Sequence, residues 1–384
     1  MLKTALFRAN EREGSVMINV AMDVHVRNSF LKARDAHGRA LAGGRAGNTL
    51  GELSQVLRGV EQAAAAAPQP VRVVMEATTN SRAIAGLLSQ WGEAAGIDLT
   101  IDVLDPRKLR TIAESTSKCD RLDTDLLLEL AASNLRLPTC HLVDEPTFAL
   151  REHLRGRADL ARVQTMLKNR VHALLHRRGI LKPTKMDLFT QRGRQFLDQL
   201  QLDEAGQHLL DQYTQVIAQL HQTLNDSEHQ LKQSARSDRW RESVELLESM
   251  PGVGLITSLT LLSELGDIHR FTSRSSVSNY AALVPVVRSS NYKTSHGKLA
   301  PGGNRHLRHV MVEAAWRAYG RVPAYESIFN RITARGGKNV AIVAVARRML
   351  EDAWTMLKRR EPFRYRGSSD PRRASSEQAV PPVA

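Results

Sequence analysis

Two aspartates three residues apart, Asp120 and Asp123, stand at the head of a leucine-rich segment and have the types and spacing to bind a metal ion. The leucines recur with helical spacing, so both carboxylates are expected on one face of a first helical turn. A hard divalent cation such as Mg²⁺ takes carboxylate oxygens as ligands and completes its shell with water and substrate phosphate. The alternative is that these acids bind no metal and are simply favoured at a helix N-terminus by the helix dipole.

Two further acids stand where buried strands are expected to end. Asp23 lies near the end of the apolar segment 16–25, and Glu76 is the last residue of the segment Val71–Glu76. A carboxylate at the end of a buried strand is a common ligand position in α/β sheets. A buried strand with an acid at its end is therefore expected twice before the helix that starts at Asp120.

The segments around these strands predict an α/β domain. They include a hairpin, two helices and a further strand, expected at Phe30–Ala33 with Arg39–Ala42, at Leu50–Ala67, at Ser81–Ala95 and at Leu99–Leu104. Strands that alternate with helices are typical of a sheet with partly parallel strands.

Composition indicates a polyanionic partner. The 384 residues predict two or three domains, and the formal charge of +14 favours nucleic acid over a basic protein without such a partner. The two cysteines, Cys119 and Cys140, are too few for a disulfide framework and suit a reducing cytoplasm. No apolar run reaches the roughly 20 residues that a membrane helix needs, so no membrane contact is expected.

The middle of the chain, from Phe148 to Arg236, predicts a helical arm. Two long helical runs flank a break at Gly179–Pro183, and the second extends over residues 189–231. This pattern favours an antiparallel, coiled-coil pair that dimerises the chain or acts as a spacer.

Near residue 244 a new helical region begins. Pro251-Gly252-Val253-Gly254 separates two helices and predicts a helix-hairpin-helix-like element. Its glycines, Gly252 and Gly254, allow backbone amides to approach a phosphate at the second helix's N-terminus. A plain helical hairpin remains the alternative.

A polar segment, Ser289–Lys298, precedes a helix that begins near Arg305 and is expected to be a loop. A hydroxyl beside Arg305 and Arg308 could act as a nucleophile on a phosphate that these cations stabilise. An ordinary serine-rich loop is the alternative.

Together these blocks resemble the transposases of the insertion sequence 110 family, which are related to the Piv-type DNA invertases. The resemblance covers about residues 16–362. It depends on Asp23, on Val74–Thr78 with Lys118-x-Asp120-x-x-Asp123, on Pro251–Gly254, and on Gly303-Asn304-Arg305-x-Leu307-Arg308.

The chain is therefore expected to be multidomain. A flexible extension, predicted from its polar composition, precedes the RuvC-like (RNase H-fold) DEDD domain, the coiled-coil arm and the mostly α-helical transposase domain that the resemblance implies, and a tail whose composition predicts disorder follows them. The corresponding residues are 1–15, 16–147, 148–240, 241–365 and 366–384.

The resemblance also implies roles for individual residues. Ser290 corresponds to the family's nucleophilic serine, with Ser289 as the fallback, and Asp125 is interpreted as a surface residue. Asn291 stands where a glycine is usual, and Pro301-Gly302 replaces a basic pair, which removes charge near the phosphate. The expected Mg²⁺ ligands are Asp23, Glu76, Asp120 and Asp123.

The implied function is that of a transposase, a site-specific recombinase that cuts and rejoins DNA through a covalent serine–DNA intermediate. The implied partners are donor and target duplexes, an element-encoded bridge RNA and further copies of the chain, as a dimer or tetramer. Two alternatives are a RuvC-like metal-dependent nuclease that uses water, and a non-catalytic nucleic-acid-binding relative.

Overall fold

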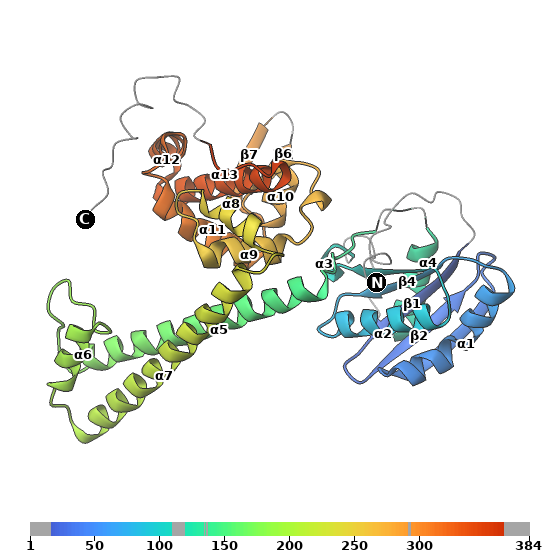
Figure 1. The fold of residues 1–384 in the computed structure, drawn as a ribbon, viewed down its shortest axis with the longest axis horizontal. Helices are drawn as coiled ribbons and strands as arrows, with labels where there is room; N and C mark the ends of the chain where they lie inside the picture. The colour runs from blue at the N-terminus through green and yellow to red at the C-terminus, as the bar shows by residue number, and fades with distance from the viewer. Residues whose placement is uncertain (1–16, 110–119, 134, 136, 291–292, 365–384) are drawn as a thin grey trace. The chain divides into compact units, whose positions relative to one another are not determined.

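The computed structural model describes residues 17–109, 120–133, 135, 137–290 and 293–364. The chain forms two compact units, Met1–Leu142 and Val143–Ala384 (Figure 1). The predicted extension at 1–15 and the predicted tail at 366–384 lie outside the described residues. Within the described part of the chain, no helix has the length and apolar character to cross a membrane.

The first unit is built on a five-stranded sheet in the order β3-β2-β1-β4-β5. The strands are β1 (Ile18–Val24), β2 (Asn28–Arg34), β3 (Ala40–Gly47), β4 (Val71–Glu76) and β5 (Leu99–Leu104). β1, β2 and β3 pair antiparallel, whereas β4 is parallel to both β1 and β5. The predicted α/β domain with partly parallel strands is confirmed.

Helices cover both faces of this sheet. On one face, α1 (Leu50–Ala66) and α2 (Ser81–Ala94) bury leucines against the even-numbered residues of β1, such as Val20 and Met22. The short α3 (Pro106–Leu109) follows β5. On the other face, α4 (Asp120–Ala132) packs its leucines against Ala21 and Val74. The alternation of side chains along each strand assigns residues to these two faces.

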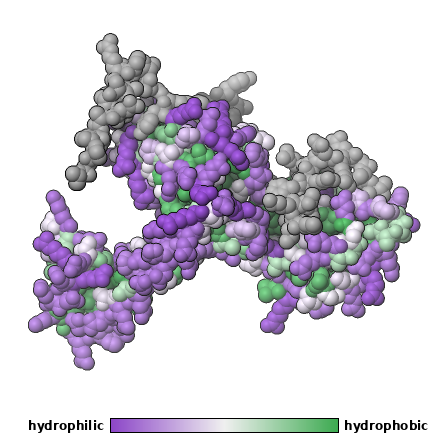
Figure 2. Space-filling view, in the orientation of Figure 1, coloured by the Kyte–Doolittle hydropathy of each residue, from purple (hydrophilic) through white to green (hydrophobic). Residues whose placement is uncertain are grey.

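The second unit begins with a long helical hairpin, α5 (Glu145–His176) and α7 (Glu204–Ala235), which we call the arm. The predicted second run, 189–231, is interrupted, since α6 (Gln191–Asp198) is a separate helix before α7. Asp144 and Asp203 cap α5 and α7 by accepting backbone hydrogen bonds. The surface of the arm is mostly hydrophilic (Figure 2).

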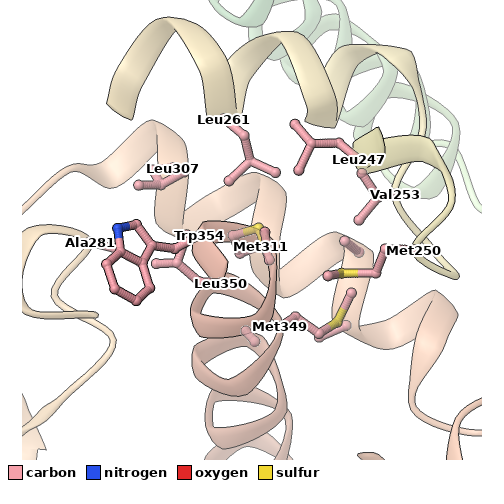
Figure 3. Packing of buried hydrophobic residues seen from close by; sticks show 14 of the residues in the cluster. Leu247, Met250, Val253, Leu261, Ala281, Leu307, Met311, Met349, Leu350 and Trp354 are labelled. Carbon is pink, nitrogen blue, oxygen red and sulfur yellow. The ribbon is translucent and has the colours of Figure 1, made fainter. Parts of the chain in front are cut away.

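The remaining elements include α13 and the helices that pack around it in a core of leucine, methionine and alanine side chains (Figure 3). They are α8 (Arg241–Glu248), α9 (Leu255–Leu265), η1 (Ile268–Arg270), α10 (Arg274–Tyr280), β6 (Pro285–Ser290), β7 (Lys293–Leu299), α11 (Arg305–Ala318), α12 (Pro323–Gly336) and α13 (Lys338–Arg359). Leu150 and Leu154 of α5 and Leu231 of α7 are buried in the same core. The arm therefore shares its core with the C-terminal helices, and an arm domain bounded at residue 240 stays a prediction.

Candidate functional site

Asp23 and Glu76 lie at the carboxyl ends of two adjacent parallel strands. β1 and β4 are paired as far as Met22 opposite Met75, and Asp23 and Glu76 are the next residue on each strand. Alternation places Asp23 on the face of Ala21 and Glu76 on the face of Val74. The structure thus brings these two predicted ligands to one level on one face of the sheet.

The surroundings of this pair are polar and open to solvent. The Asp23 side chain is 23% exposed, with its Oδ2 3.2 Å from His25 Nε2, and Glu76 is exposed. Carboxylate oxygens at a solvent-accessible strand end fit the ligand set of a hard cation that keeps part of its water shell. Among the described side chains no cluster of three metal-ligating residues occurs.

The other two predicted ligands lie in the first turn of α4, which covers the same face of the sheet. α4 begins at Asp120, and Asp123 follows within that turn. The side chains of both aspartates lie outside the described part of the structure. At the other end of α4, Arg72 Nη1 donates to the Ala131 carbonyl at 3.1 Å and anchors that end over β4.

Asp125 has a role beyond the one predicted. It accepts hydrogen bonds from Lys32 Nζ at 2.6 Å and Arg34 Nη2 at 3.2 Å, both on β2. Its side chain is only 34% exposed. Asp125 is therefore a partly exposed residue, as predicted, and in addition forms an ion-paired contact between α4 and the sheet.

The predicted nucleophile lies in a β-hairpin and not in a loop. β6 and β7 pair antiparallel, with Ser290 opposite Lys293 and Ser289 opposite Thr294. Asn291 and the side chains of this tip lie outside the described part of the structure. Which of Ser289 and Ser290 is the nucleophile therefore stays a prediction.

The two glycines of the Pro251–Gly254 turn differ in their surroundings. Gly252 has φ +85°, and a Cβ there would lie 2.5 Å from the Ala314 carbonyl oxygen of α11. Gly254 is the N-cap of α9 without a side-chain cap, and a Cβ there would meet no atom within 4 Å. Close packing against α11 accounts for Gly252, which leaves Gly254 as the better candidate for phosphate contact.

The Gly303-Asn304-Arg305 sequence opens α11. Asn304 Oδ1 accepts from the Leu307 amide at 3.0 Å and caps the helix. Arg305 is exposed, whereas Arg308 is half-buried and donates to the Gly302 carbonyl at 3.3 Å. Of the two cations at this helix start, Arg305 is therefore the more exposed, and Arg308 is held against the turn before it.

Comparison with known proteins assigns the chain to a family. A model described as "Transposase IS116/IS110/IS902 family" matches residues 244–328, and a second, DEDD_Tnp_IS110, described as "Transposase", matches residues 20–178. The chain belongs to this transposase family. Its members are insertion-sequence enzymes that cleave and rejoin DNA.

Curated relatives extend the similarity over most of this transposase. The transposase for insertion sequence element IS1328 of Yersinia enterocolitica is 25% identical over 86% of this chain and 94% of its own. The transposase for IS1111A of Coxiella burnetii is 25% identical over 70% and 74%. The pilin gene-inverting protein of Moraxella bovis is 26% identical over 53% and 58%.

Sequence reasoning missed one prominent polar residue of this transposase, Glu264. It is 1% exposed at the end of the otherwise uncharged helix α9, where the sequence reads Leu-Leu-Ser-Glu-Leu-Gly. A single acid within an apolar run was the available signal, because a buried carboxylate requires partners.

Proposed function

We propose that this transposase cuts DNA by attack of Ser290 on a phosphodiester, assisted by a divalent metal ion, most simply Mg²⁺. The metal ligands in this proposal are Asp23, Glu76, Asp120 and Asp123. The product of the attack is a covalent serine–DNA intermediate that is later resealed to a new DNA end.

The observation that carries the metal site is the level register of β1 and β4. It brings Asp23 and Glu76 together on the face that α4, beginning at Asp120, also covers. The strand order β3-β2-β1-β4-β5, with β2 antiparallel to β1, supports an RNase H-like, RuvC-type domain. In that arrangement the carboxylates of α4 complete the ligand set.

The chemistry balances without an external energy source. The Ser290 hydroxyl loses its proton to a base as its oxygen bonds to phosphorus, and the bond from phosphorus to the leaving deoxyribose oxygen breaks. That oxygen takes up a proton. A second transesterification, from the serine ester to another DNA hydroxyl, reverses these steps on a new end. A divalent cation, when bound, would neutralise the negative charge that develops on the phosphate oxygens during the attack.

Phosphate binding is assigned to the start of α11 and to the α9 turn. Arg305 and Arg308 supply charge, and the backbone amides after Gly254 supply hydrogen-bond donors. The formal charge of +14 is also compatible with a guide RNA. Retention of a discrete RNA by the purified protein, and its loss after nuclease treatment, would support that partner.

The arm is proposed as a coiled-coil dimerisation element. Val163 and Met166 are 42% and 50% exposed on α5, and Val216 is 41% exposed on α7. Gln164 Nε2 and the Ile217 carbonyl are 3.5 Å apart, so these apolar side chains lie at one level of the arm. A second arm would cover them and give the dimer or tetramer.

The test of the nucleophile is a denaturing gel for protein–DNA adducts. Wild type is incubated with element-junction DNA, Mg²⁺ and co-expressed flanking RNA, beside Ser290→Ala and the neighbouring control Ser289→Ala. We expect an adduct in wild type and Ser289→Ala and none in Ser290→Ala. Cleavage that persists without an adduct would instead indicate a RuvC-like nuclease that uses water.

The metal site has its own pair of variants. Asp23→Asn should abolish cleavage and adduct formation, whereas Asp125→Asn, which changes the same charge on α4, should retain both. If Asp23→Asn cleaved at the wild-type rate, the metal-site assignment would be wrong. If no variant and no wild-type preparation cleaved DNA that the protein binds, the non-catalytic alternative would hold.

A further inference from the structure

A buried acid joins three parts of the second unit. Glu264 lies in α9, where every residue from Thr257 to Leu265 is buried. An unpaired carboxylate in such surroundings would be strongly destabilising, because the charge has lost its water and gained no partner. Glu264 is therefore expected to have partners that offset the cost of burying its charge.

The first contact is with the arm. Arg155 of α5 donates Nε to Glu264 Oε1 at 2.7 Å and Nη2 to Oε2 at 2.8 Å, a two-bond fork. Arg151, one turn earlier, donates Nε and Nη2 to the neighbouring Ser263 carbonyl at 3.0 and 2.6 Å. Its Nε also lies 3.5 Å from Glu264 Oε2. Two arginines of the arm thus converge on the end of α9.

The electrostatics agree with a charged Glu264. Burial alone raises the pKa of this carboxyl, but hydrogen bonds from Arg155 and Asn304 and the charge of both arginines lower it below its ordinary value. The hydrogen bonds to Glu264 likewise raise the pKa of Arg155, whereas burial lowers that of Arg151. We therefore treat Arg155 as the main counter-ion.

The second contact is with the start of α11. Asn304 Nδ2 donates to Glu264 Oε2 at 2.7 Å, while Asn304 Oδ1 caps the helix at Leu307 and the Asn304 amide donates to the Tyr280 carbonyl at 2.8 Å. Tyr280 in turn donates its hydroxyl to the Glu264 carbonyl at 3.1 Å. All three of these polar groups of Asn304 are thus engaged.

This arrangement fixes the first turn of α11 more tightly than a cap requires. Gly303 precedes it at φ +68°, and a Cβ there would lie 2.5 Å from Ala282 Cβ. The chain therefore enters α11 between a close backbone contact and the Asn304–Glu264 bond. Arg305 and Arg308 lie one and four residues after Asn304, so their direction follows from the same restraint.

We propose that Glu264 is a positioning residue that, through Asn304 Nδ2, holds the first turn of α11 in the orientation in which Arg305 and Arg308 bind phosphates, and that Arg155 ties this orientation to the arm. This inference rests on the proposed function, in which those arginines contact nucleic acid. Glu264 itself touches no phosphate.

Three substitutions separate the link from the cap. Asn304→Ser keeps a helix-capping oxygen and the net charge but removes the amide that donates to Glu264. Asn304→Asp keeps the cap and places an acceptor against an acceptor. The double variant Glu264→Gln/Asn304→Asp exchanges donor and acceptor, restores the hydrogen bond to residue 304 and has the net charge of wild type. It keeps Oε1 as the acceptor for Arg155 Nε but loses the bond from Arg155 Nη2.

The readout is the dependence of duplex-DNA affinity on salt, measured with labelled DNA and the full-length protein. Loss of both arginine contacts lowers the slope of log K against log salt by about 1.8, or about 60-fold in affinity at 0.1 M salt. We expect most of that loss in Asn304→Ser and Asn304→Asp and a near wild-type slope in the double variant. Glu264→Gln alone should not tighten binding.

A charge effect predicts a different pattern in the single variants. Removing an acid would strengthen binding in Glu264→Gln, adding one would weaken it in Asn304→Asp, and the uncharged change Asn304→Ser would bind as wild type. These opposite charge changes would add to a near wild-type slope in the double variant as well, so Glu264→Gln and Asn304→Ser decide between the two explanations. An additive cycle, or a wild-type slope in Asn304→Ser, would overturn the inference. Thermal unfolding of each variant identifies loss of folding, and Asn304→Ser, the mildest change, keeps the test decisive in that event.

Arg305→Ala separates this inference from the proposed function. If Arg305→Ala leaves the slope unchanged, the phosphate contact itself is absent and the proposed function of α11 fails. If Arg305→Ala lowers the slope but Asn304→Ser does not, the contact exists and Glu264 does not position it.

Discussion

Replacement of Gly252 by alanine should destabilise the second unit strongly, although the residue lies in a turn. Gly252 has φ +85°, a conformation that costs an L-residue about 1–2 kcal/mol. The new Cβ would lie 2.5 Å from the Ala314 carbonyl oxygen and 3.0 Å from Ala318 Cβ. Both neighbours belong to α11, so the turn or the helix must shift, which typically costs about 1–3 kcal/mol.

The sum is about 3 kcal/mol, and the location makes the effect measurable. Met250 and Val253 beside the turn are buried in the core around α13 (Figure 3), so a shift of the turn disturbs that core. For a unit of this size, about 3 kcal/mol corresponds to roughly 6–12 °C in Tm. Tryptophan fluorescence during heating reports on this unit through Trp240, Trp316 and Trp354.

The matched control is Gly254→Ala, two residues further along the same turn. Gly254 has φ −122°, and a Cβ there would meet no atom within 4 Å, so its Tm should stay close to that of wild type. Equal Tm values for the two variants would refute the packing explanation of Gly252. A wild-type Tm with weakened DNA binding in Gly252→Ala would favour the phosphate role instead.

Three further predictions concern charges and the arm. Asp125→Asn should lower the free energy of unfolding by less than about 1 kcal/mol in urea titrations, because the ion pairs with Lys32 and Arg34 are partly exposed; a larger loss would mean that α4 depends on this contact. The lowered pKa of Glu264 means that its contribution is complete above the pKa of the unfolded chain and is lost as pH falls through the lower folded value. Between pH 6 and about pH 3, Tm should therefore fall more in wild type than in Glu264→Gln, and parallel curves would contradict the ionised assignment. Met166→Glu should reduce the mass seen by light scattering if exposed apolar side chains of the arm join two copies, and Glu152→Gln, also on α5, serves as the control that should leave the mass unchanged.

The sheet of the first unit could be predicted because its signals are local. The segments Val71–Glu76 and Leu99–Leu104 were predicted with the bounds that the structure gives them. Apolar residues on both faces mark buried strands, and Pro68 and Gly96 mark the helix ends beside them. The acids at the strand ends followed from the same pattern, and the parallel register then determined that Asp23 and Glu76 lie at one level.

The hairpin of β6 and β7 could not be predicted on the same basis. Its residues around Ser289–Lys298 are mostly small, polar or charged, and Asn291-Tyr292 between the strands is not the Asn-Gly or Asp-Gly pair that signals a tight turn. The strands form because β6 and β7 pair with each other, and their composition does not indicate this pairing. Both serine candidates consequently lie on a paired strand.

Ion pairs between residues far apart in the chain could not be predicted from the spacing of residues in the sequence. Asp125 was set aside because it lies outside the face of Asp120 and Asp123, yet its partner Lys32 is 93 residues away in the chain. Arg155 and Glu264 are 109 residues apart. Helical periodicity can tell which residues share a face, but not which element that face will meet.

The motif at the start of α11 shows how one short sequence divides into different physical tasks. Gly303 permits the close approach to Ala282, Asn304 caps the helix and bonds Glu264, and only then do Arg305 and Arg308 present charge. In the proposed function, the first two residues act by restricting where the arginines can be. Since Arg155 holds the other side of Glu264, a tilt of the arm would have to break a charge-assisted fork before α11 could move independently. The arm and the first turn of α11 should therefore move together.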